Sequence, residues 1–294
     1  MPGSRSIAKL ARAKDVSTFS QRDARAVASI LREVAQAEIL PRFGGEIAQG
    51  IRQKTSSFDL VTDADEVAEV AIAAALQHEF PGCTVVGEEA TARDPTLLDT
   101  LSESDLTFVV DPIDGTKNFS AGLPLFGVMA AVLQRGEIIA GVILDPIRDD
   151  WAVALKGEGA WIEDSSGRVT ELRVAAPPPS ASDMSGIVSW LFFPAPMRAQ
   201  VTANLSRVAA AVDYRCAAHQ YRALAAGHYD FALYGKVMPW DHAPGTLIHM
   251  EAGGYVALLD GAPYTVQRRT PGLLCAPNEE SWNALRDALV GERR

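Results

Sequence analysis

The stretch Thr107–Phe119, TFVVDPIDGTKNF, places two aspartates three positions apart at the end of an apolar run. The hydrophobic residues from Phe108 to Val110 favour burial, whereas ionised carboxylates at Asp111 and Asp114 are strongly disfavoured in an apolar interior. Two interpretations compete. One is a solvated turn, in which aspartate is common, and the other is a pocket that binds a cation.

Composition limits the class of protein. The chain has 294 residues, 48% hydrophobic and 22% charged, which is typical of one large or two modest globular domains. Its net charge of -10 argues against a nucleic-acid partner, because phosphate backbones attract clustered Lys and Arg. No apolar run reaches the roughly 18 residues that a membrane span needs, so we expect no membrane partner.

The amino terminus and the cysteines predict the compartment. Residues 1–15 hold basic residues but no apolar segment, so a secretory signal is not expected. Cys83, Cys216 and Cys275 are odd in number, far apart in the sequence and without metal-site spacing. We therefore expect a cytoplasmic protein with reduced, mostly buried thiols.

The first part of the chain predicts two helices. Apolar residues at helical spacing follow the N-cap candidate Ser20, and this helix is expected to end before Pro41. A second helix is expected to begin near Asp63, because Thr62 and Asp65 have the spacing of a capping box. The buried face of this second helix is expected to consist of Val67, Val70, Ala74 and Leu76.

A change of pattern divides the chain. From the opening stretch onwards, apolar runs separated by glycine-containing turns predict an antiparallel meander. Pro177–Pro179 cannot continue a strand, so we place a boundary between residues 1–176, with most of the metal ligands, and residues 177–294. Strands and helices then alternate, including helices over Ala199–Val212 and about His242–Ala252.

Acidic side chains occur where several expected elements end, which is where α/β proteins build their sites. They are Asp65 at a helix start, Glu88 and Glu89 after a strand, Asp111 and Asp114 after the next strand, and Asp241 in PWDHAPG. Oxygen ligands of this charge suit Mg²⁺ or Mn²⁺ rather than zinc. Each motif alone has a plainer interpretation, which for Asp241 is the N-cap of a helix that turns His242 away from the site.

Four motifs in order make the chain resemble the inositol monophosphatase family of Mg²⁺-dependent, lithium-sensitive phosphatases. These motifs are KTSSFDLVTDAD, VGEE, DPIDGTKNF and PWDHAPGTLIHMEAGG, and they extend from Lys54 to Gly254. The resemblance implies an α/β fold, a layered αβαβα sandwich with an α+β N-terminal half and an α/β C-terminal half. It also implies two or three metal ions in the cleft between the halves, a small phosphorylated substrate and a homodimer.

The resemblance assigns roles to the matching residues. The implied metal ligands are Glu88, Asp111, the carbonyl of Ile113, Asp114 and Asp241. Asp65 and Thr116, with Glu88 through its metal, would orient the attacking water. The N–H groups of Gly115 and Thr116 would hold the phosphate, with Glu89 and Lys54 as supporting residues. The implied reaction is in-line attack of a metal-activated water on a phosphomonoester, without a covalent enzyme intermediate.

Substrate choice depends on residues that depart from the family pattern. Relatives that hydrolyse inositol phosphates have a glutamate where this chain has Tyr234, and the nearby segment with Gln220 is bulkier here. Lys117 is similar to relatives that act on nucleotide bisphosphates. We expect an inositol-1-phosphate-like polyol or sugar phosphate, contacted by Gly115, Thr116, Lys117, Gln220, Tyr234 and Asp241. The alternatives are histidinol phosphate, a 3'(2'),5'-bisphosphate nucleotide, a non-catalytic accessory role in transcription, and calcium binding.

Overall fold

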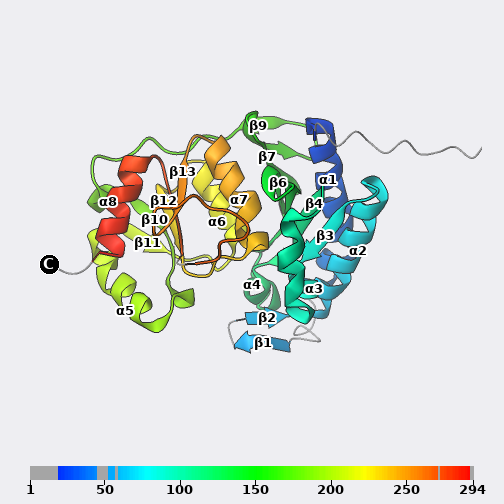
Figure 1. The fold of residues 1–294 in the computed structure, drawn as a ribbon, viewed down its shortest axis with the longest axis horizontal. Helices are drawn as coiled ribbons and strands as arrows, with labels where there is room; N and C mark the ends of the chain where they lie inside the picture. Colours follow the sequence, from blue (N-terminus) through cyan, green and yellow to red (C-terminus); the bar gives the residue numbers. More distant parts are fainter. Residues whose placement is uncertain (1–18, 45–51, 57–58, 271, 292–294) are drawn as a thin grey trace, which may run out of the picture.

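Two β-sheets and the helices stacked against them form the framework of the fold (Figure 1). The computed structural model describes residues 19–44, 52–56, 59–270 and 272–291. Within these ranges the larger sheet has seven strands, in the spatial order β3 (Thr84–Gly87), β4 (Thr107–Asp114), β5 (Gly127–Gln134), β6 (Glu137–Asp145), β7 (Asp150–Leu155), β8 (Gly159–Asp164) and β9 (Val169–Glu171). β3 and β4 are parallel, and β4 to β9 form the predicted antiparallel meander.

The smaller sheet is built from the second part of the chain. Its described strands lie in the order β11 (Ala210–Val212), β10 (Ser185–Ser189), β12 (Phe231–Tyr234), β14 (Leu273–Ala276) and β13 (Tyr255–Leu258). β10 is parallel to both of its neighbours, whereas β14 is antiparallel to β12 and β13. The larger sheet ends before Pro177 and the smaller begins after Pro179; the division into two domains at this point remains our proposal.

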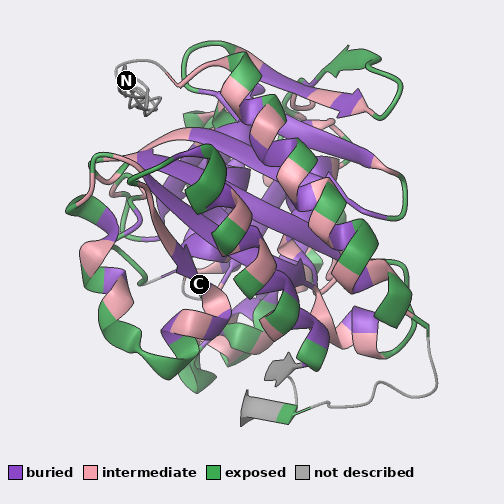
Figure 2. Ribbon diagram, turned by 90° about the vertical axis from the view of Figure 1, so that its right-hand side faces the viewer, coloured by how far each residue is buried: buried purple, intermediate pink, exposed green. Residues whose placement is uncertain are grey.

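Helices α1 (Gln21–Val34) and α2 (Asp63–Glu79) cover the outer face of the larger sheet. Ser20 caps α1 through a capping box with Asp23, as the sequence predicts for the start of this helix. The strands beneath are buried along most of their length, while the helices expose their outer side (Figure 2). The apolar run of β5, fully buried from Val128 to Leu133, is therefore core.

Two further helices, α6 (Ala217–Ala225) and α7 (Pro239–Glu251), fill the layer between the sheets. α7 approaches β6 so closely that a Cβ at Gly141 would lie 2.6 Å from the carbonyl oxygen of Pro244. Beyond the smaller sheet, α5 (Ala195–Asn204) and α8 (Glu279–Leu289) form the last layer. This stacking confirms the αβαβα sandwich, visible from right to left in Figure 1.

The predicted buried face of α2 is wrong for three of its four residues. Val67, Val70 and Ala74 are exposed, and only Leu76 is buried. The buried residues follow a different row, namely Ala64, Asp65, Ala68, Glu69, Ile72 and Leu76. The capping residue Asp65 faces inward, and this fixes the rotation of the helix because residues two and five positions later then point outward.

Two helix boundaries in the second half also differ from expectation. The helix predicted over Ala199–Val212 ends at Asn204, and Ala210–Val212 instead forms β11, which pairs with β10. Tertiary pairing decides here, since alanine-rich segments have little strand preference of their own. α7 begins at Pro239, a favourable first helical residue, so Asp241 lies inside the first turn and is not the N-cap.

A small hairpin and a short helix complete the described elements near the end of β4. β1 (Arg52–Ser56) and β2 (Asp59–Val61) are antiparallel and lie beside α4 (Thr116–Ser120) (Figure 1). The three cysteines are free thiols, two of them buried. Among the helices of the described residues, none has the length and hydrophobicity to cross a membrane.

Candidate active site

A pocket opens where β3 and β4 end, between the larger sheet and the helices of the middle layer. Its lining combines residues from both parts of the chain, including Glu88, Asp111 and Thr116 from the first and Arg215, Gln220 and Asp241 from the second. The structure thus brings together residues more than 150 positions apart in the sequence. Most of the residues that the sequence marks as candidates lie at this pocket.

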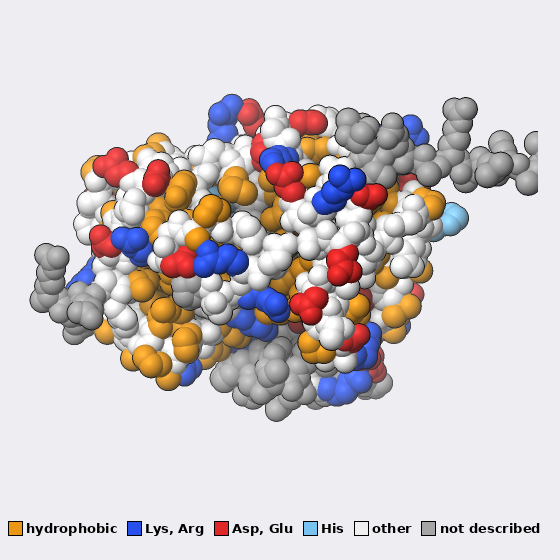
Figure 3. Space-filling model, in the orientation of Figure 1, with side chains coloured by type: hydrophobic (Ala, Val, Ile, Leu, Met, Phe, Trp, Pro, Cys, Tyr) orange, Lys and Arg blue, Asp and Glu red, His pale blue; other side chains and the backbone are white. Residues whose placement is uncertain are grey.

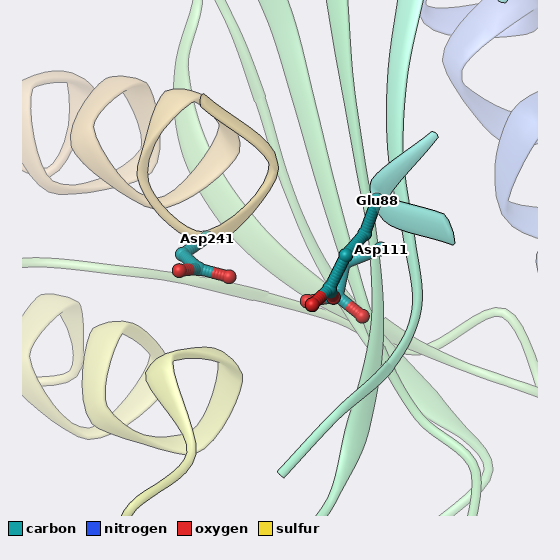
Figure 4. A group of neighbouring side chains, drawn as sticks. All are labelled: Glu88, Asp111 and Asp241. Atoms are coloured by element: carbon teal, nitrogen blue, oxygen red, sulfur yellow. The ribbon is translucent and has the colours of Figure 1, made fainter. Parts of the chain in front are cut away.

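Three carboxylates form a compact group in the pocket. Glu88 is the first residue of α3 (Glu88–Arg93), Asp111 lies in β4, and Asp241 lies in the first turn of α7. Each offers an oxygen, and these oxygens all lie within 4.8 Å of one another. Figure 4 shows Glu88 and Asp111 side by side, with Asp241 facing them. Like charges at this separation repel each other, so the group fits a hard divalent cation.

The register of the sheet explains why these side chains meet. β3 and β4 are parallel with Gly87 opposite Val110, so Glu88 and Asp111, the residues that follow, reach the same sheet edge. Asp111 is 2% exposed, and its Oδ1 accepts a hydrogen bond from Ile113 N at 3.0 Å. This bond turns the chain at Pro112 and fixes the orientation of the carboxylate.

Asp114 is placed differently from the other predicted ligands. A register shift between Asp111 and Asp114 interrupts the pairing of β4 with β5, and Asp114 lies outside the compact group. Its Oδ2 accepts from the N–H of Ala218 at 2.5 Å and from the thiol of Cys216 at 3.1 Å. Burial, followed by the charge of Asp241, raises the pKa of Asp114 to about 7. A cation in the pocket would favour its ionised form.

The capping box of α2 also belongs to the site. Asp65 Oδ2 accepts from Thr62 N at 2.8 Å, while its Oδ1 lies 3.2 Å from Thr116 Oγ. The same hydroxyl lies 2.9 Å from the carbonyl oxygen of Ile113. The carboxylate of Asp65 therefore caps the amino terminus of α2 and also contacts the hydroxyl of Thr116.

Gly115 allows the chain to turn from β4 into α4. Its φ of 89° lies in the left-handed region, and a Cβ there would lie 2.8 Å from the carbonyl oxygen of Leu125. A residue with a side chain would meet both a backbone penalty and a clash. Thr116 and Lys117 follow directly, and all three residues line the pocket.

The opposite wall holds the candidates for substrate contact. Gln220 is 1% exposed, and its Nε2 donates to Asp213 Oδ1 at 2.9 Å. Tyr234 is 3% exposed and packs against the ring of His242. Contrary to expectation, His242 is not turned away: it lines the pocket, with hydrogen bonds to Tyr221 Oη and Lys236 O.

Glu89 and Lys54 are the residues predicted to support the metal site. Glu89 is 3% exposed and does not line the pocket; its N–H donates to Glu69 Oε2 at 2.7 Å. The side chain of Lys54 lies outside the described residues.

Several residues of the site escape the sequence analysis. Glu69 accepts from the N–H groups of Glu89 and Ala90, each at 2.7 Å, and so anchors the start of the helix that carries Glu88. The spacing of Glu69, four residues after Asp65 on one helix face, is the signal that marks it. Arg215 and Lys236 line the pocket from loops, and no local pattern indicates that position.

Comparison with known proteins gives consistent results. The model of the inositol monophosphatase family matches residues 13–292. The protein named Nus factor SuhB from Pasteurella multocida is 35% identical over 234 residues, which cover 74% of this chain and 81% of that protein. Nus factor SuhB from Escherichia coli strain K12 is 31% identical over 216 residues, 71% of this chain and 75% of that protein.

Solved structures agree at the level of the fold. The crystal structure of extragenic suppressor protein suhB from Bartonella henselae superposes with a TM-score of 0.73 and 28% identity, over 90% of this chain and 96% of that chain. A Thermotoga maritima IMPase also gives a TM-score of 0.73, over 92% of this chain and 98% of that chain. Its identity of 24% supports the fold alone.

Proposed function

The chain belongs to the inositol monophosphatase family, as its four motifs indicate, and we propose that it is a Mg²⁺-dependent phosphomonoesterase. The group formed by Glu88, Asp111 and Asp241 carries this proposal, because three carboxylate oxygens within 4.8 Å of one another can together bind a hard divalent cation. The proposed substrate is a small polyol or sugar phosphate, similar to inositol 1-phosphate.

The donor set determines the kind of metal. Glu88, Asp111 and Asp241 supply only carboxylate oxygens, with Asp114 and the carbonyl of Ile113 nearby in the same pocket. Such ligands fit Mg²⁺, with Mn²⁺ as the alternative, and up to three ions follow from the family resemblance. When bound, Mg²⁺ supplies the positive charge that neutralises the carboxylates, acidifies a water and stabilises the leaving oxygen.

The remaining residues of the site orient and hold the reactants. Asp65 accepts from Thr116, so this pair would direct a water towards phosphorus and take up its proton. The N–H groups of Gly115 and Thr116 would contact the phosphate, which Gly115 can accommodate because it lacks a side chain. Gln220 and Tyr234 would contact the remainder of the substrate from the opposite wall.

A second candidate function is an accessory role, in transcription for example, in which catalysis is incidental. The observation in its favour is that curated relatives are named Nus factor SuhB. The charge of the chain does not favour direct contact with nucleic acid: on the face in Figure 3, Lys and Arg alternate with Asp and Glu and form no broad basic area. A homodimer in the cytoplasm remains a prediction from the sequence.

A substrate panel tests the proposal. Phosphate release with Mg²⁺ is measured for inositol 1-phosphate, histidinol phosphate, 3'-phosphoadenosine 5'-phosphate, fructose 1,6-bisphosphate and glycerol 2-phosphate. We expect turnover of at least one substrate, abolished by EDTA. No turnover on the whole panel, with Mg²⁺ binding shown by calorimetry, would instead favour the accessory role.

A further inference from the structure

One aspartate organises the wall of the pocket opposite the carboxylate group. Asp213 directly follows β11, and the parallel pairing of β11 with β10 brings it close to Ser189, the last residue of β10. Its Oδ1 accepts hydrogen bonds from Arg215 N at 2.9 Å, from Gln220 Nε2 at 2.9 Å and from Ser189 Oγ at 3.4 Å. The three donor residues line the pocket, whereas Asp213 itself does not. A single carboxylate oxygen therefore links three segments of the wall.

These contacts fix the orientation of the Gln220 side-chain amide. The N–H of Arg215 can only donate, so Asp213 Oδ1 is an acceptor and Gln220 must turn its NH₂ group towards it. Gln220 is 1% exposed, and close packing leaves its side chain little freedom to rotate away. The carbonyl oxygen Oε1 is bonded to the same carbon atom as Nε2, and it therefore points away from Asp213.

The carbonyl oxygen of Gln220 is an acceptor that a ligand can use. It has no hydrogen-bond partner among the residues that the structure describes. Tyr234 Oη also lacks a partner but is enclosed by protein atoms, whereas Gln220 Oε1 is not enclosed and belongs to a residue that lines the pocket. A carbonyl oxygen accepts a hydrogen bond from a hydroxyl but gains none from an alkyl group. A site with such a group discriminates against analogues that lack the hydroxyl.

We propose that Asp213 is a positioning residue, which holds Gln220 so that its carbonyl oxygen accepts a hydrogen bond from a hydroxyl of the substrate. This inference rests on the proposed function and narrows its substrate class. The alcohol released by hydrolysis carries at least one further hydroxyl, which reaches Gln220 while the scissile phosphate lies at the carboxylate group. Gln220 touches the substrate, and Asp213 acts only through Gln220.

Matched substrate pairs test whether a hydroxyl is recognised. Inositol 1-phosphate and cyclohexyl phosphate share a six-membered carbon ring, and the second has no hydroxyl. Glycerol 2-phosphate and isopropyl phosphate share a three-carbon skeleton in the same way. We expect kcat/KM to be about tenfold or more higher for the hydroxylated member of at least one pair. A ratio near one for both pairs would overturn the proposal.

Variants of the two residues test how the hydroxyl is recognised. Gln220→Met keeps the length of the side chain but removes the carbonyl, and it should reduce the ratio of kcat/KM within the selective pair about tenfold. Asp213→Ala should reduce the ratio similarly, because it releases the amide of Gln220. Asp213→Asn is the conservative variant: its amide oxygen can replace Oδ1 as the acceptor, so most of the ratio should remain. An unchanged ratio in Gln220→Met, or equal ratios in Asp213→Asn and Asp213→Ala, would refute the proposal.

A double variant and a control separate positioning from a general disturbance of the wall. If Asp213 acts through Gln220, Asp213→Ala should cause no further loss of the ratio when it is combined with Gln220→Met. Asp230→Ala is the control, because Asp230 Oδ2 accepts from Ser185 N at the other end of β10, outside the pocket. Its ratio should equal that of the wild type. A further loss in the double variant, or a reduced ratio in Asp230→Ala, would refute the positioning role.

A binding measurement separates this inference from the proposed function. If both members of each pair are hydrolysed equally well, the contact with Gln220 is refuted and the phosphatase remains. If nothing is hydrolysed, the shift in Tm with each member of a pair, in Mg²⁺, decides instead. A larger shift with the hydroxylated member, lost in Gln220→Met, supports the contact without a phosphatase, and equal shifts refute it. Gln220→Met keeps this test valid even if Asp213→Ala does not fold, because it leaves Asp213 in place.

Discussion

The hydroxyl Oγ of Thr116 lies 3.2 Å from Oδ1 of Asp65, although the two residues are 51 positions apart in the chain. Asp65 is 1% exposed and held by Thr62, so its carboxylate has a fixed orientation. The pair connects the start of α2 to the start of α4 and places a proton acceptor beside a hydroxyl at the pocket. Water activation in the proposed reaction depends on this pair.

We expect Thr116→Ala to lower kcat about 10²-fold or more, since a positioned proton-transfer group contributes that much. Thr116→Ser keeps the hydroxyl and should retain most of the rate. Steady-state kinetics on the best substrate of the panel measures both. Equal activity of the Ala and Ser variants would show that the hydroxyl takes no part.

Gly115→Ala should destabilise the protein and inactivate it. The φ of 89° disfavours any side chain, and the new Cβ would lie 2.8 Å from Leu125 O, so the free energy of unfolding should fall by about 3 kcal/mol. Gly122→Ala is the control: its φ is 72° but no atom lies within 4 Å of the new Cβ, so its cost should be about 1 kcal/mol. Urea denaturation compares the two, and equal costs would contradict the clash.

Glu69→Gln should weaken metal binding although Glu69 is not one of the proposed metal ligands. Burial raises the pKa of Glu69, yet the carboxylate accepts from two N–H groups at the start of α3. The amide of glutamine has only one oxygen to accept hydrogen bonds, whereas the two carboxylate oxygens of Glu69 each accept one. One N–H at the start of α3 would lose its partner, and Glu88, the first residue of that helix, would be held less firmly. The Kd for Mg²⁺ should therefore rise about 10-fold or more. Glu66→Gln on the same helix, where Glu66 pairs with Arg52, should leave that Kd unchanged. Calorimetric titration measures it, and equal Kd values in both variants would refute the supporting role.

His249 should make the protein sensitive to acid. Its ring, on α7, is fully buried and makes a hydrogen bond with the carbonyl oxygen of Ala276 in β14; burial lowers the pKa of His249 to about 4, below the usual 6.5. Between about pH 4 and 6.5, His249 is protonated in the unfolded chain but neutral in the folded protein. Protonation therefore favours unfolding: the stability that neutral His249 allows is fully present above pH 6.5 and is lost as the pH falls to about 4. The loss amounts to on the order of 3 kcal/mol.

His249→Gln removes this dependence. Its free energy of unfolding should fall less steeply than that of the wild type between pH 6.5 and 4, as measured by urea denaturation at each pH. Parallel curves would show that His249 does not titrate on unfolding.

The sequence predicts those parts of the fold that local chemistry controls. Ser20 and Thr62 mark the starts of two helices because capping boxes satisfy N–H groups locally. The rotation of α2 could not be read from hydrophobicity, because the inward-facing carboxylate of Asp65 orients the helix and leaves Val67 and Val70 exposed. β11 forms only because β10 lies beside it.

In the candidate site, too, the sequence predicts residues that lie in local motifs but not those placed by tertiary contacts. Glu88, Asp111 and Asp241 could be predicted because each lies in a recognisable sequence motif, and the structure brings their side chains together. Arg215 and Lys236 have no local signal, since only the folded arrangement brings their loops to the pocket. Glu69 acts through α3, and its role is visible only once the N–H groups it binds are located.

Phosphate release as a function of Mg²⁺ concentration, compared between the wild type and Asp111→Asn, tests the proposed function most directly. Asp105→Asn is the control, because Asp105 is exposed and pairs with Arg135. We expect Mg²⁺-dependent release that EDTA abolishes, a loss of about 10³-fold in Asp111→Asn with its Tm retained, and no loss in Asp105→Asn. Release that persists in EDTA, or equal activity of the two variants, would contradict a metal-dependent phosphatase at this carboxylate group.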